Sequence, residues 1–233
     1  MRKYILLLTS CLALFLFVTA CNPICEDCKK TIGYAYFPLE VGRFIEYSVA
    51  EEEFALGRGA VSRSYQWKES ITEKYQDAAN QTVFKIIRYK RTDDSQKWQP
   101  DSVFTVRQSL DQIVKNESGK EYVKLVFPIA EKLSWNGNIF NNLGEDKYEL
   151  RNIEKSYKIN GQTFDKSISV IQQNDSTLVG QDKRTEIYAE NIGLIYKENI
   201  SLQFCSSSPS CVGKAQIDFG RRRYVRFRRN GVE

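Results

Sequence analysis

Short runs in which apolar and polar residues alternate recur along most of this chain, and they constrain its fold more than any other feature. The clearest run places six residues on one face and only polar residues between them: Tyr65, Trp67, Glu69, Ile71, Glu73 and Tyr75. Side chains of a strand point to opposite faces in turn, so this period predicts a half-buried antiparallel strand. Two glutamates interrupt the apolar face of that strand.

Further runs of the same kind predict strands over 83–89, 103–106, 122–127, 157–170, 194–204 and 215–227. In the run at 122–127, Val123 and Leu125 are expected to face one way and Lys124 the other. Asn160-Gly161 is typical of a type I′ hairpin turn, because both residues accept positive φ. A long loop is expected over 128–146, with room for a short helix at 129–133. We therefore predict an all-β fold of roughly ten strands, a single curved antiparallel sheet forming a half-barrel or open barrel, with at most one or two short helices.

The N-terminus has the composition of an export signal. Arg2 and Lys3 precede an apolar stretch that ends at Val18-Thr19-Ala20-Cys21. The stretch is too short for a membrane span and no stop-transfer charges follow it. The motif resembles the bacterial lipoprotein signal, in which the cysteine is acylated and becomes the first mature residue. That resemblance implies a signal peptide over 1–20, lipidation of Cys21, a flexible tether over 21–31 and one β domain over 32–233.

Charge and histidine content narrow the classes of function. Removing Arg2 and Lys3 with the leader lowers the formal net charge from +5 to +3, so the exported chain is only mildly basic. The sequence contains no histidine. This excludes a Ser-His-Asp or Cys-His catalytic centre and a histidine-ligated metal. We expect no enzymatic activity, no cofactor and no metal, although an enzyme that uses two carboxylates needs no histidine.

Four cysteines remain after the signal and the lipidated residue are set aside: Cys25, Cys28, Cys205 and Cys211. An exported compartment favours disulfides. We expect Cys205 to pair with Cys211 around a Ser/Pro loop, and Cys25 with Cys28 in the tether. A four-cysteine zinc site or a redox-active pair is the alternative, but the second pair has a wider gap than zinc ribbons use.

Three segments carry a resemblance to known proteins. They are Phe37-Pro38-Leu39-Glu40-Val41-Gly42-Arg43-Phe44-Ile45-Glu46-Tyr47, Trp135-Asn136-Gly137-Asn138 and Thr185-Glu186-Ile187-Tyr188-Ala189-Glu190-Asn191-Ile192-Gly193-Leu194-Ile195-Tyr196-Lys197-Glu198. Together they resemble uncharacterised Gram-negative lipoproteins that are similar in architecture to LolA/LolB-like half-barrels. The resemblance implies a fold and a place in the cell envelope, at the outer membrane on either its periplasmic or its surface side. It carries no catalytic residue and no lipid-carrier residue to this chain.

Arginines are concentrated near the C-terminus, in the run from Arg221 to Arg229. Alternation places Arg222, Arg226 and Arg228 on the face opposite Val225 and Phe227. These three are candidates for contact with an anionic lipid surface or an acidic glycan. The alternative that we favour is an edge strand whose charges prevent aggregation. Nucleic acid is not an expected partner of an envelope protein.

Other candidate residues are acidic or aromatic. Glu51-Glu52-Glu53 is expected in a solvated turn and Asp93-Asp94 in a polar loop. Trp67 is expected in the core, whereas Trp98 and Trp135 lie in polar segments and are candidates for contact with a ligand.

The sequence therefore predicts a membrane-anchored lipoprotein that acts as a binding or envelope-structural module. Its site is expected on the apolar concave face of the sheet, and its partner is a lipid, a glycan or another envelope protein. Two alternatives stay open. One is a periplasmic carrier or chaperone for lipid or lipoprotein, which requires a large empty apolar cavity. The other is a carbohydrate-active hydrolase with paired carboxylates.

Overall fold

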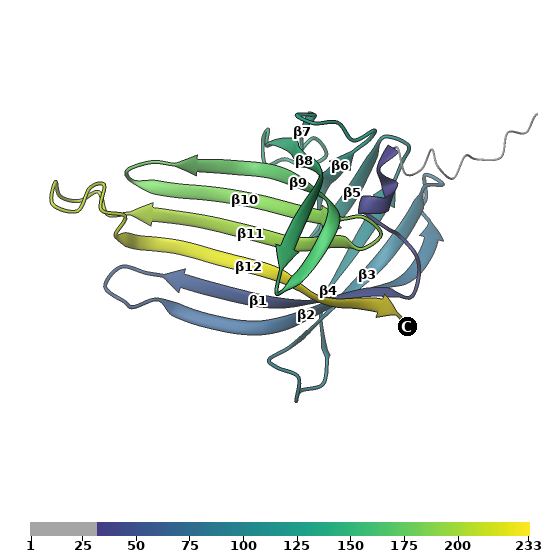
Figure 1. Ribbon diagram of the computed structural model, residues 1–233, viewed down its shortest axis with the longest axis horizontal. Coiled ribbons are helices and arrows are strands. Elements are labelled where there is room, and N and C mark those ends of the chain that lie inside the picture. The colour runs from purple at the N-terminus through teal and green to yellow at the C-terminus, as the bar shows by residue number, and fades with distance from the viewer. Residues whose placement is uncertain (1–31) are drawn as a thin grey trace, which may run out of the picture.

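The computed structural model describes residues 32–233, which form a single sheet of twelve antiparallel strands (Figure 1). The predicted signal peptide and tether lie outside the described residues. The strands are β1 (Arg43–Phe54), β2 (Val61–Gln76), β3 (Thr82–Arg91), β4 (Gln99–Gln108), β5 (Gln112–Glu117), β6 (Lys120–Val126), β7 (Ser134–Asn136), β8 (Lys147–Ile159), β9 (Gln162–Ser176), β10 (Gly180–Ala189), β11 (Gly193–Phe204) and β12 (Ile217–Val232). One 3-10 turn, η1 (Tyr34–Tyr36), precedes β1. The all-β fold and the single curved sheet predicted from the sequence are confirmed.

The first and last strands in the sequence, β1 and β12, pair with each other in the middle of the sheet. The strand order is β6-β5-β4-β3-β2-β1-β12-β11-β10-β9-β8-β7, so every other neighbour in the sheet is also a neighbour in the sequence. This pairing joins two meanders into one sheet that curls until β6 approaches β7. The sheet is nearly closed into a barrel, with one seam that no strand ladder seals.

Three hydrogen bonds cross the seam between β6 and the segment that contains β7. The backbone N–H of Val123 donates to the carbonyl of Gly137 at 2.9 Å, and the indole N–H of Trp135 donates to the carbonyl of Val123 at 2.9 Å. The side-chain amide of Asn141 donates to the carbonyl of Glu121 at 2.8 Å. Side chains and isolated backbone groups therefore hold the seam where a regular ladder would hold two paired strands.

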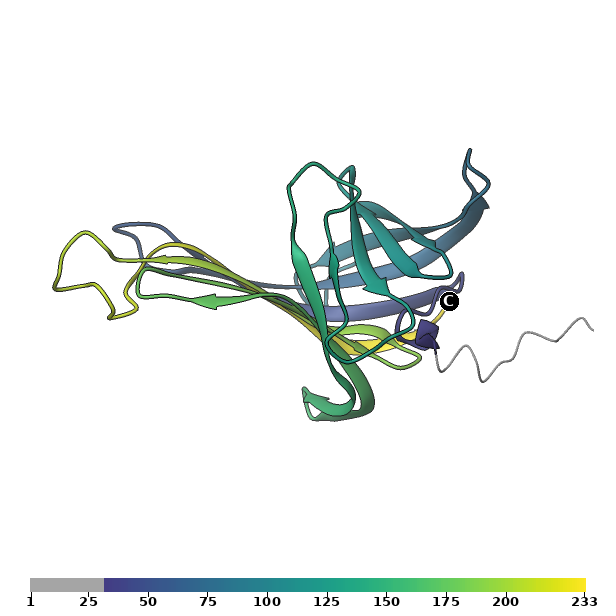
Figure 2. The ribbon, with the colours of Figure 1, turned by 90° about the horizontal axis from the view of Figure 1, so that it is seen from above.

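Three apolar clusters pack against the sheet. The largest lies inside the barrel and contains Phe104, Val106, Leu125 and Ile168, and the segment from Ile32 to Leu39 packs against it. The second joins the β8–β9 hairpin to β10, β11 and β12, with Phe164 and Phe227 at a centroid distance of 5.2 Å. That hairpin curls away from the barrel (Figure 2). The third is formed by Tyr47, Val49, Trp67 and Val225.

Beyond the barrel, β9 to β12, β1 and β2 continue as a flat extension, and the long β11–β12 loop lies at its far end (Figures 1 and 2). Glu51, Glu52 and Glu53 belong to this extension as part of β1 and oppose Arg223, Arg222 and Arg221 on β12. The expectation that these acids form a solvated turn is therefore wrong, because each faces a cation across the ladder.

Other local expectations can be compared with the same strands. The Asn160-Gly161 turn is confirmed, with φ of 49° and 83°. The short helix at 129–133 is absent, because the N–H of Lys132 donates to the carbonyl of Leu150 and the N–H of Leu150 to that of Leu133. These bonds extend the β7–β8 pairing.

The edge-strand interpretation of the arginine run is also wrong, because β12 lies between β1 and β11.

Gly137 at the seam provides a test of how the barrel closes. A methyl group on this residue would overlap the ring of Tyr148, which is only 3% exposed. We expect Gly137→Ala to lower the free energy of unfolding by about 1–3 kcal/mol, as overpacking does elsewhere. Urea denaturation followed by circular dichroism would measure this. Gly59→Ala is the matched control, since nothing lies within 4 Å of its added methyl group. Equal stability of the two variants would contradict this account of the seam.

A charged cavity inside the barrel as the candidate functional site

A cavity of about 160 Å³ lies inside the barrel. Its apolar and aromatic walls come from the segment before β1 and from β1, β2, β3, β10, β11, β12 and the β10–β11 turn: Phe37, Pro38, Phe44, Ile45, Tyr47, Trp67, Ile71, Ile86, Tyr188, Ile192, Leu194 and Val225. Nine charged side chains share this lining with them. The concave face is thus not the uniformly apolar surface that the sequence led us to expect.

Seven of these charged residues form a group that we name the charged belt: Glu69, Arg88, Lys115, Glu117, Lys124, Glu186 and Lys197. Most of them point inward because of simple alternation along their strands. Glu69, for example, lies between Trp67 and Ile71 on the inward face of β2. Lys124 is different, because the β5–β6 register shifts beside it and leaves it opposite no residue of β5. Such a bulge re-aims a side chain.

The first half of the belt is centred on Glu69. The guanidinium Nε of Arg88 donates to Glu69 Oε1 at 2.9 Å. Lys115 Nζ lies 3.6 Å from Glu69 Oε2 and 3.1 Å from Glu117 Oε1. Residues from β2, β3 and β5 are therefore linked through one lysine that lies between two carboxylates.

The second half is centred on Glu186, whose side chain is 1% exposed. Lys124 Nζ and Lys197 Nζ lie 2.7 Å and 2.8 Å from the same oxygen, Oε1. The hydroxyl of Tyr188 donates to Oε2 at 2.7 Å. Since Lys124 is on β6 and Glu186 is on β10, this ion pair spans the side of the barrel where the sheet is not sealed.

The belt keeps its carboxylates ionised. Burial raises the pKa of Glu186, but Lys124 and Lys197 outweigh it and hold that pKa far below its usual range. The pKa of Glu117 is lowered well below its usual value because Lys115, Lys197 and Lys124 together outweigh burial. The pKa of Glu69 is lowered in the same way by Lys115 and Arg88. At Lys124 burial has the larger effect, and it lowers the pKa of the ammonium group despite the attraction of Glu186.

Trp67 has an unusual environment in the wall of the cavity. It is 9% exposed, its ring packs 5.5 Å from that of Tyr65, and the Arg88 guanidinium lies 3.9 Å from its centroid. Its indole N–H is buried and has no acceptor among the described residues. A buried indole N–H usually has a partner. The expectation that Trp67 serves packing is therefore incomplete, because the residue also lines the site.

The two tryptophans that the sequence offered as ligand contacts lie elsewhere. Trp135 packs on Tyr148 at 6.0 Å and bridges the seam through its indole N–H. Trp98 lies beneath the guanidinium of Arg91, 4.2 Å from its centroid. Neither lines the cavity. Any contact of theirs with a ligand stays a prediction.

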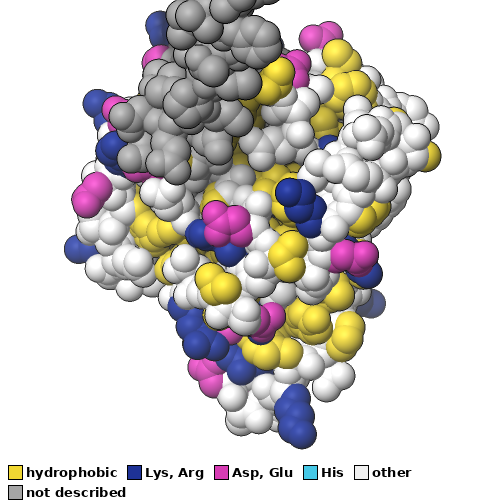
Figure 3. All heavy atoms as spheres, turned by 90° about the vertical axis from the view of Figure 1, so that its right-hand side faces the viewer, with side chains coloured by type: hydrophobic (Ala, Val, Ile, Leu, Met, Phe, Trp, Pro, Cys, Tyr) yellow, Lys and Arg dark blue, Asp and Glu magenta, His cyan; other side chains and the backbone are white. Residues whose placement is uncertain are grey.

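The three candidate arginines of β12 have different surroundings. Arg222 lies 3.5 Å from Glu52, and Arg228 forms two hydrogen bonds with Asp94 at 2.9 Å and 3.1 Å. Arg226 stacks on Tyr224 at 4.8 Å. The face shown in Figure 3 likewise mixes hydrophobic, basic and acidic side chains without a continuous basic area. Contact with an anionic surface stays a prediction, and acidic partners already occupy two of the three side chains.

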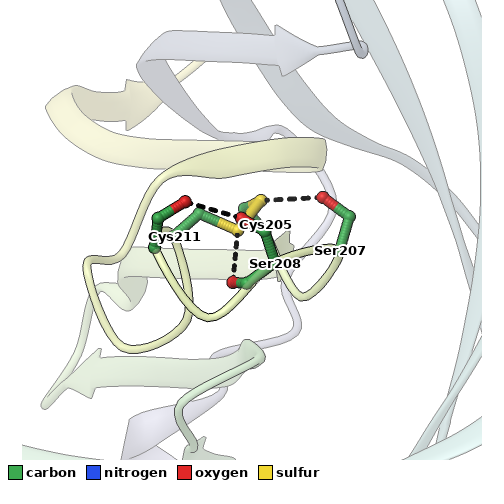
Figure 4. The surroundings of a disulfide bond; sticks show 5 residues. Cys205, Ser207, Ser208 and Cys211 are labelled. Carbon is green, nitrogen blue, oxygen red and sulfur yellow. Dashed lines mark hydrogen bonds between the residues drawn. A yellow bond between two sulfur atoms is a disulfide. The ribbon is translucent and has the colours of Figure 1, made fainter.

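Cys205 and Cys211 form a disulfide within the β11–β12 loop, as the sequence predicted, with their Cα atoms 5.7 Å apart (Figure 4). Ser207 Oγ lies 3.4 Å from Cys205 Sγ. The bond closes the loop between β11 and β12 at the end of the flat extension, and neither cysteine lines the cavity. Cys21, Cys25 and Cys28 lie outside the described residues.

Comparison with known proteins gives no match: no protein-family model fits the chain, and no curated protein or solved structure is significantly similar to it. Within residues 32–233, no helix has the length and apolar character needed to cross a membrane. The same residues contain no cluster of three or more side chains suited to holding a metal ion.

The acidity dependence of folding provides a test of the belt. Because the folded pKa of Glu186 lies below the usual 4.5, its contribution to stability is present above that pH and is lost as the pH falls. We expect Glu186→Gln to cost about 3–5 kcal/mol at neutral pH, since it leaves two buried ammonium groups without their carboxylate. The difference from the unchanged protein should shrink as the pH falls to about 3.

Urea denaturation at both pH values would measure this difference. Glu53→Gln is the control, because its side chain is 44% exposed and its ion pairs are on the surface. We expect a change within about 0.5 kcal/mol for that variant. A loss for Glu186→Gln that is the same at both pH values would contradict an ionised, lysine-bound Glu186.

Proposed function

We propose that this protein is a lipid-anchored module of the bacterial cell envelope that binds a small ligand inside its barrel. The observation that carries the proposal is the cavity itself, where aromatic walls and a belt of charged side chains meet inside a nearly closed sheet. Ligand sites are typically concave and apolar, with a few convergent polar groups. Binding is proposed in preference to catalysis, in line with the absence of histidine.

The N-terminal sequence supports the envelope location. Residues 22–31 separate Cys21 from Ile32, which packs against the barrel core. Ten residues span at most about 35 Å when fully extended. A lipid on Cys21 would therefore hold the domain close to the bilayer. The side of the membrane is left open, as is the proposed kinship with half-barrel lipoproteins.

The volume of the cavity favours a small ligand over a lipid of the kind that a lipid carrier would bind. A cavity of about 150 Å³ in another protein holds one benzene molecule, and the cavity here is about 160 Å³. A two-chain lipid needs several times this space. The volume therefore favours a single ring or a short chain.

The electrostatics of the belt favour binding over glycoside hydrolysis. A glycosidase needs a general acid whose pKa is raised so that it is protonated when it acts. The cavity carboxylates have lowered pKa values because lysines and Arg88 contact them. Such groups stay ionised and serve as acceptors.

A fragment screen tests the proposed binding site. Ligand-observed NMR with small aromatic and aliphatic fragments should identify binders of the purified domain. Leu194→Phe narrows the cavity and should abolish their binding, whereas Leu110→Phe, at a site 86% exposed, should leave it intact. Fragments that bind both variants equally, or no binders at all, would refute a ligand site inside the barrel.

A Cys21→Ser variant tests the anchor. We expect the unchanged protein to fractionate with membranes and to carry an acyl mass on its N-terminal peptide, because the thiol of Cys21 is the predicted attachment point. The variant should lose both properties, while Cys205→Ser should keep them. Protease treatment of intact cells would then report the side of the membrane. Retention of the Cys21→Ser protein at the membrane would contradict lipidation.

A further inference from the structure

The cavity lining carries more positive than negative charge. Six cationic side chains line it, against the three carboxylates Glu69, Glu117 and Glu186. Two of the cations have acidic partners outside the lining, because Arg43 lies 3.3 Å from Glu40 and Arg223 lies 2.6 Å from Glu51. The remaining four, Arg88, Lys115, Lys124 and Lys197, share three carboxylates, so one positive charge is left over.

The surplus is concentrated at Glu186. Lys124 and Lys197 contact the same oxygen, and the other oxygen accepts from Tyr188. One carboxylate thus serves two ammonium groups, and the side chain of Lys124 is only 7% exposed. A buried cation that is not fully compensated is costly, and a second anion beside the two lysines would offset that cost.

Trp67 provides a second and independent observation. Its indole N–H is buried and has no acceptor within residues 32–233, and the residue belongs to the wall of the same cavity. The surplus cation and this donor are thus two polar groups of the cavity lining that lack a protein oxygen. The ring packs with Tyr47 and Val225, which line the same cavity.

We propose that the cavity binds a small organic anion, an aromatic or short-chain carboxylate whose charged group lies at Lys124 and Lys197 and whose apolar body packs against the aromatic wall. The volume limits the body to about one ring or a short chain. A charged hydrogen-bonded pair inside a barrel is shielded from solvent, which makes the charge of the ligand a strong determinant of affinity. This inference rests on the ligand site proposed above and specifies its chemistry.

Three probes of similar shape and different charge test the inference: benzoate, benzyl alcohol and benzylamine. Quenching or shift of tryptophan fluorescence measures binding, with Trp67→Phe showing which part of the signal comes from the cavity. We expect benzoate to bind at least tenfold more tightly than the alcohol, and benzylamine to bind most weakly. Hexanoate should follow benzoate, because the carboxylate is the shared feature.

Two variants shift the charge of the belt in opposite directions. Lys197→Met removes one of the two ammonium groups and should weaken benzoate binding about tenfold, the usual effect of losing one charged hydrogen bond. Glu117→Gln removes a competing carboxylate and should tighten it severalfold. General damage to the fold would weaken binding in both variants, so opposite changes distinguish electrostatic recognition from disruption. Lys183→Met, outside the lining and paired with Glu198, alters the net charge equally and should leave affinity unchanged.

The outcomes separate this inference from the proposed function. Equal affinity for the three probes, or weaker benzoate binding in both charge variants, would overturn the preference for anions while leaving a ligand site in the barrel. Should Lys197→Met unfold, Lys124→Met and Glu117→Gln supply the same contrast. A protein that binds neither benzoate nor hexanoate but does bind neutral fragments refutes the inference alone, whereas one that binds no fragment refutes the site as well.

Discussion

The contact between Lys124 and Glu186 is the interaction on which the rest of this structure depends. The sheet is continuous from β6 round to β7, and within the described part of the chain three hydrogen bonds join its two ends. Lys124 on β6 and Glu186 on β10 meet at 2.7 Å inside the barrel, on the side where the ladder is missing. A charged hydrogen bond in a buried site is stronger than a neutral one. This contact therefore ties β6, one of the two strands at the seam, to β10 in the other half of the sheet, and it joins residues of the belt around one cavity.

Burying the charged belt inside the barrel has a large desolvation cost. Replacing a buried ion pair by apolar side chains of similar volume is often neutral or even stabilising, because the apolar pair has no desolvation cost. The interior around Phe104, Val106 and Leu125 shows that this chain can build such a core. All seven residues of the belt line the cavity, so the desolvation cost falls at the place where a ligand can approach. This coincidence is the main physical reason to connect the belt with function rather than with stability.

Much of the fold could be predicted from the sequence because strand alternation and turn chemistry are local. The Tyr65–Tyr75 alternation, the Asn160-Gly161 turn and the Cys205–Cys211 pair all depend on residues close together in the chain. The pairing of β1 with β12 is not local, and an arginine-rich strand has the same alternation at the edge of a sheet as in its middle. The site had one visible signal, Glu69, which with Glu73 interrupts the apolar face of its strand. Lys124 had none, because the bulge that turns it inward interrupts the alternation from which its direction was predicted, and Glu186 could not be linked to it without the closed sheet.

Glu186 takes part both in closing the barrel and in the proposed binding of an anion, so a bound ligand acts on the contacts that hold the barrel together. Glu186 Oε1 holds Lys124 from one end of the sheet and Lys197 from β11. An anion that takes up the surplus charge at these lysines either joins the existing contacts or competes with Glu186 for Lys124. In the first case the ligand adds a contact to Lys124; in the second it replaces the contact between Lys124 and Glu186. Mass action favours whichever folded arrangement binds the ligand. The seam and the cavity are thus coupled through the buried carboxylate of Glu186. A change in the contacts of that carboxylate affects both the attachment of β6 and the charge that a ligand meets.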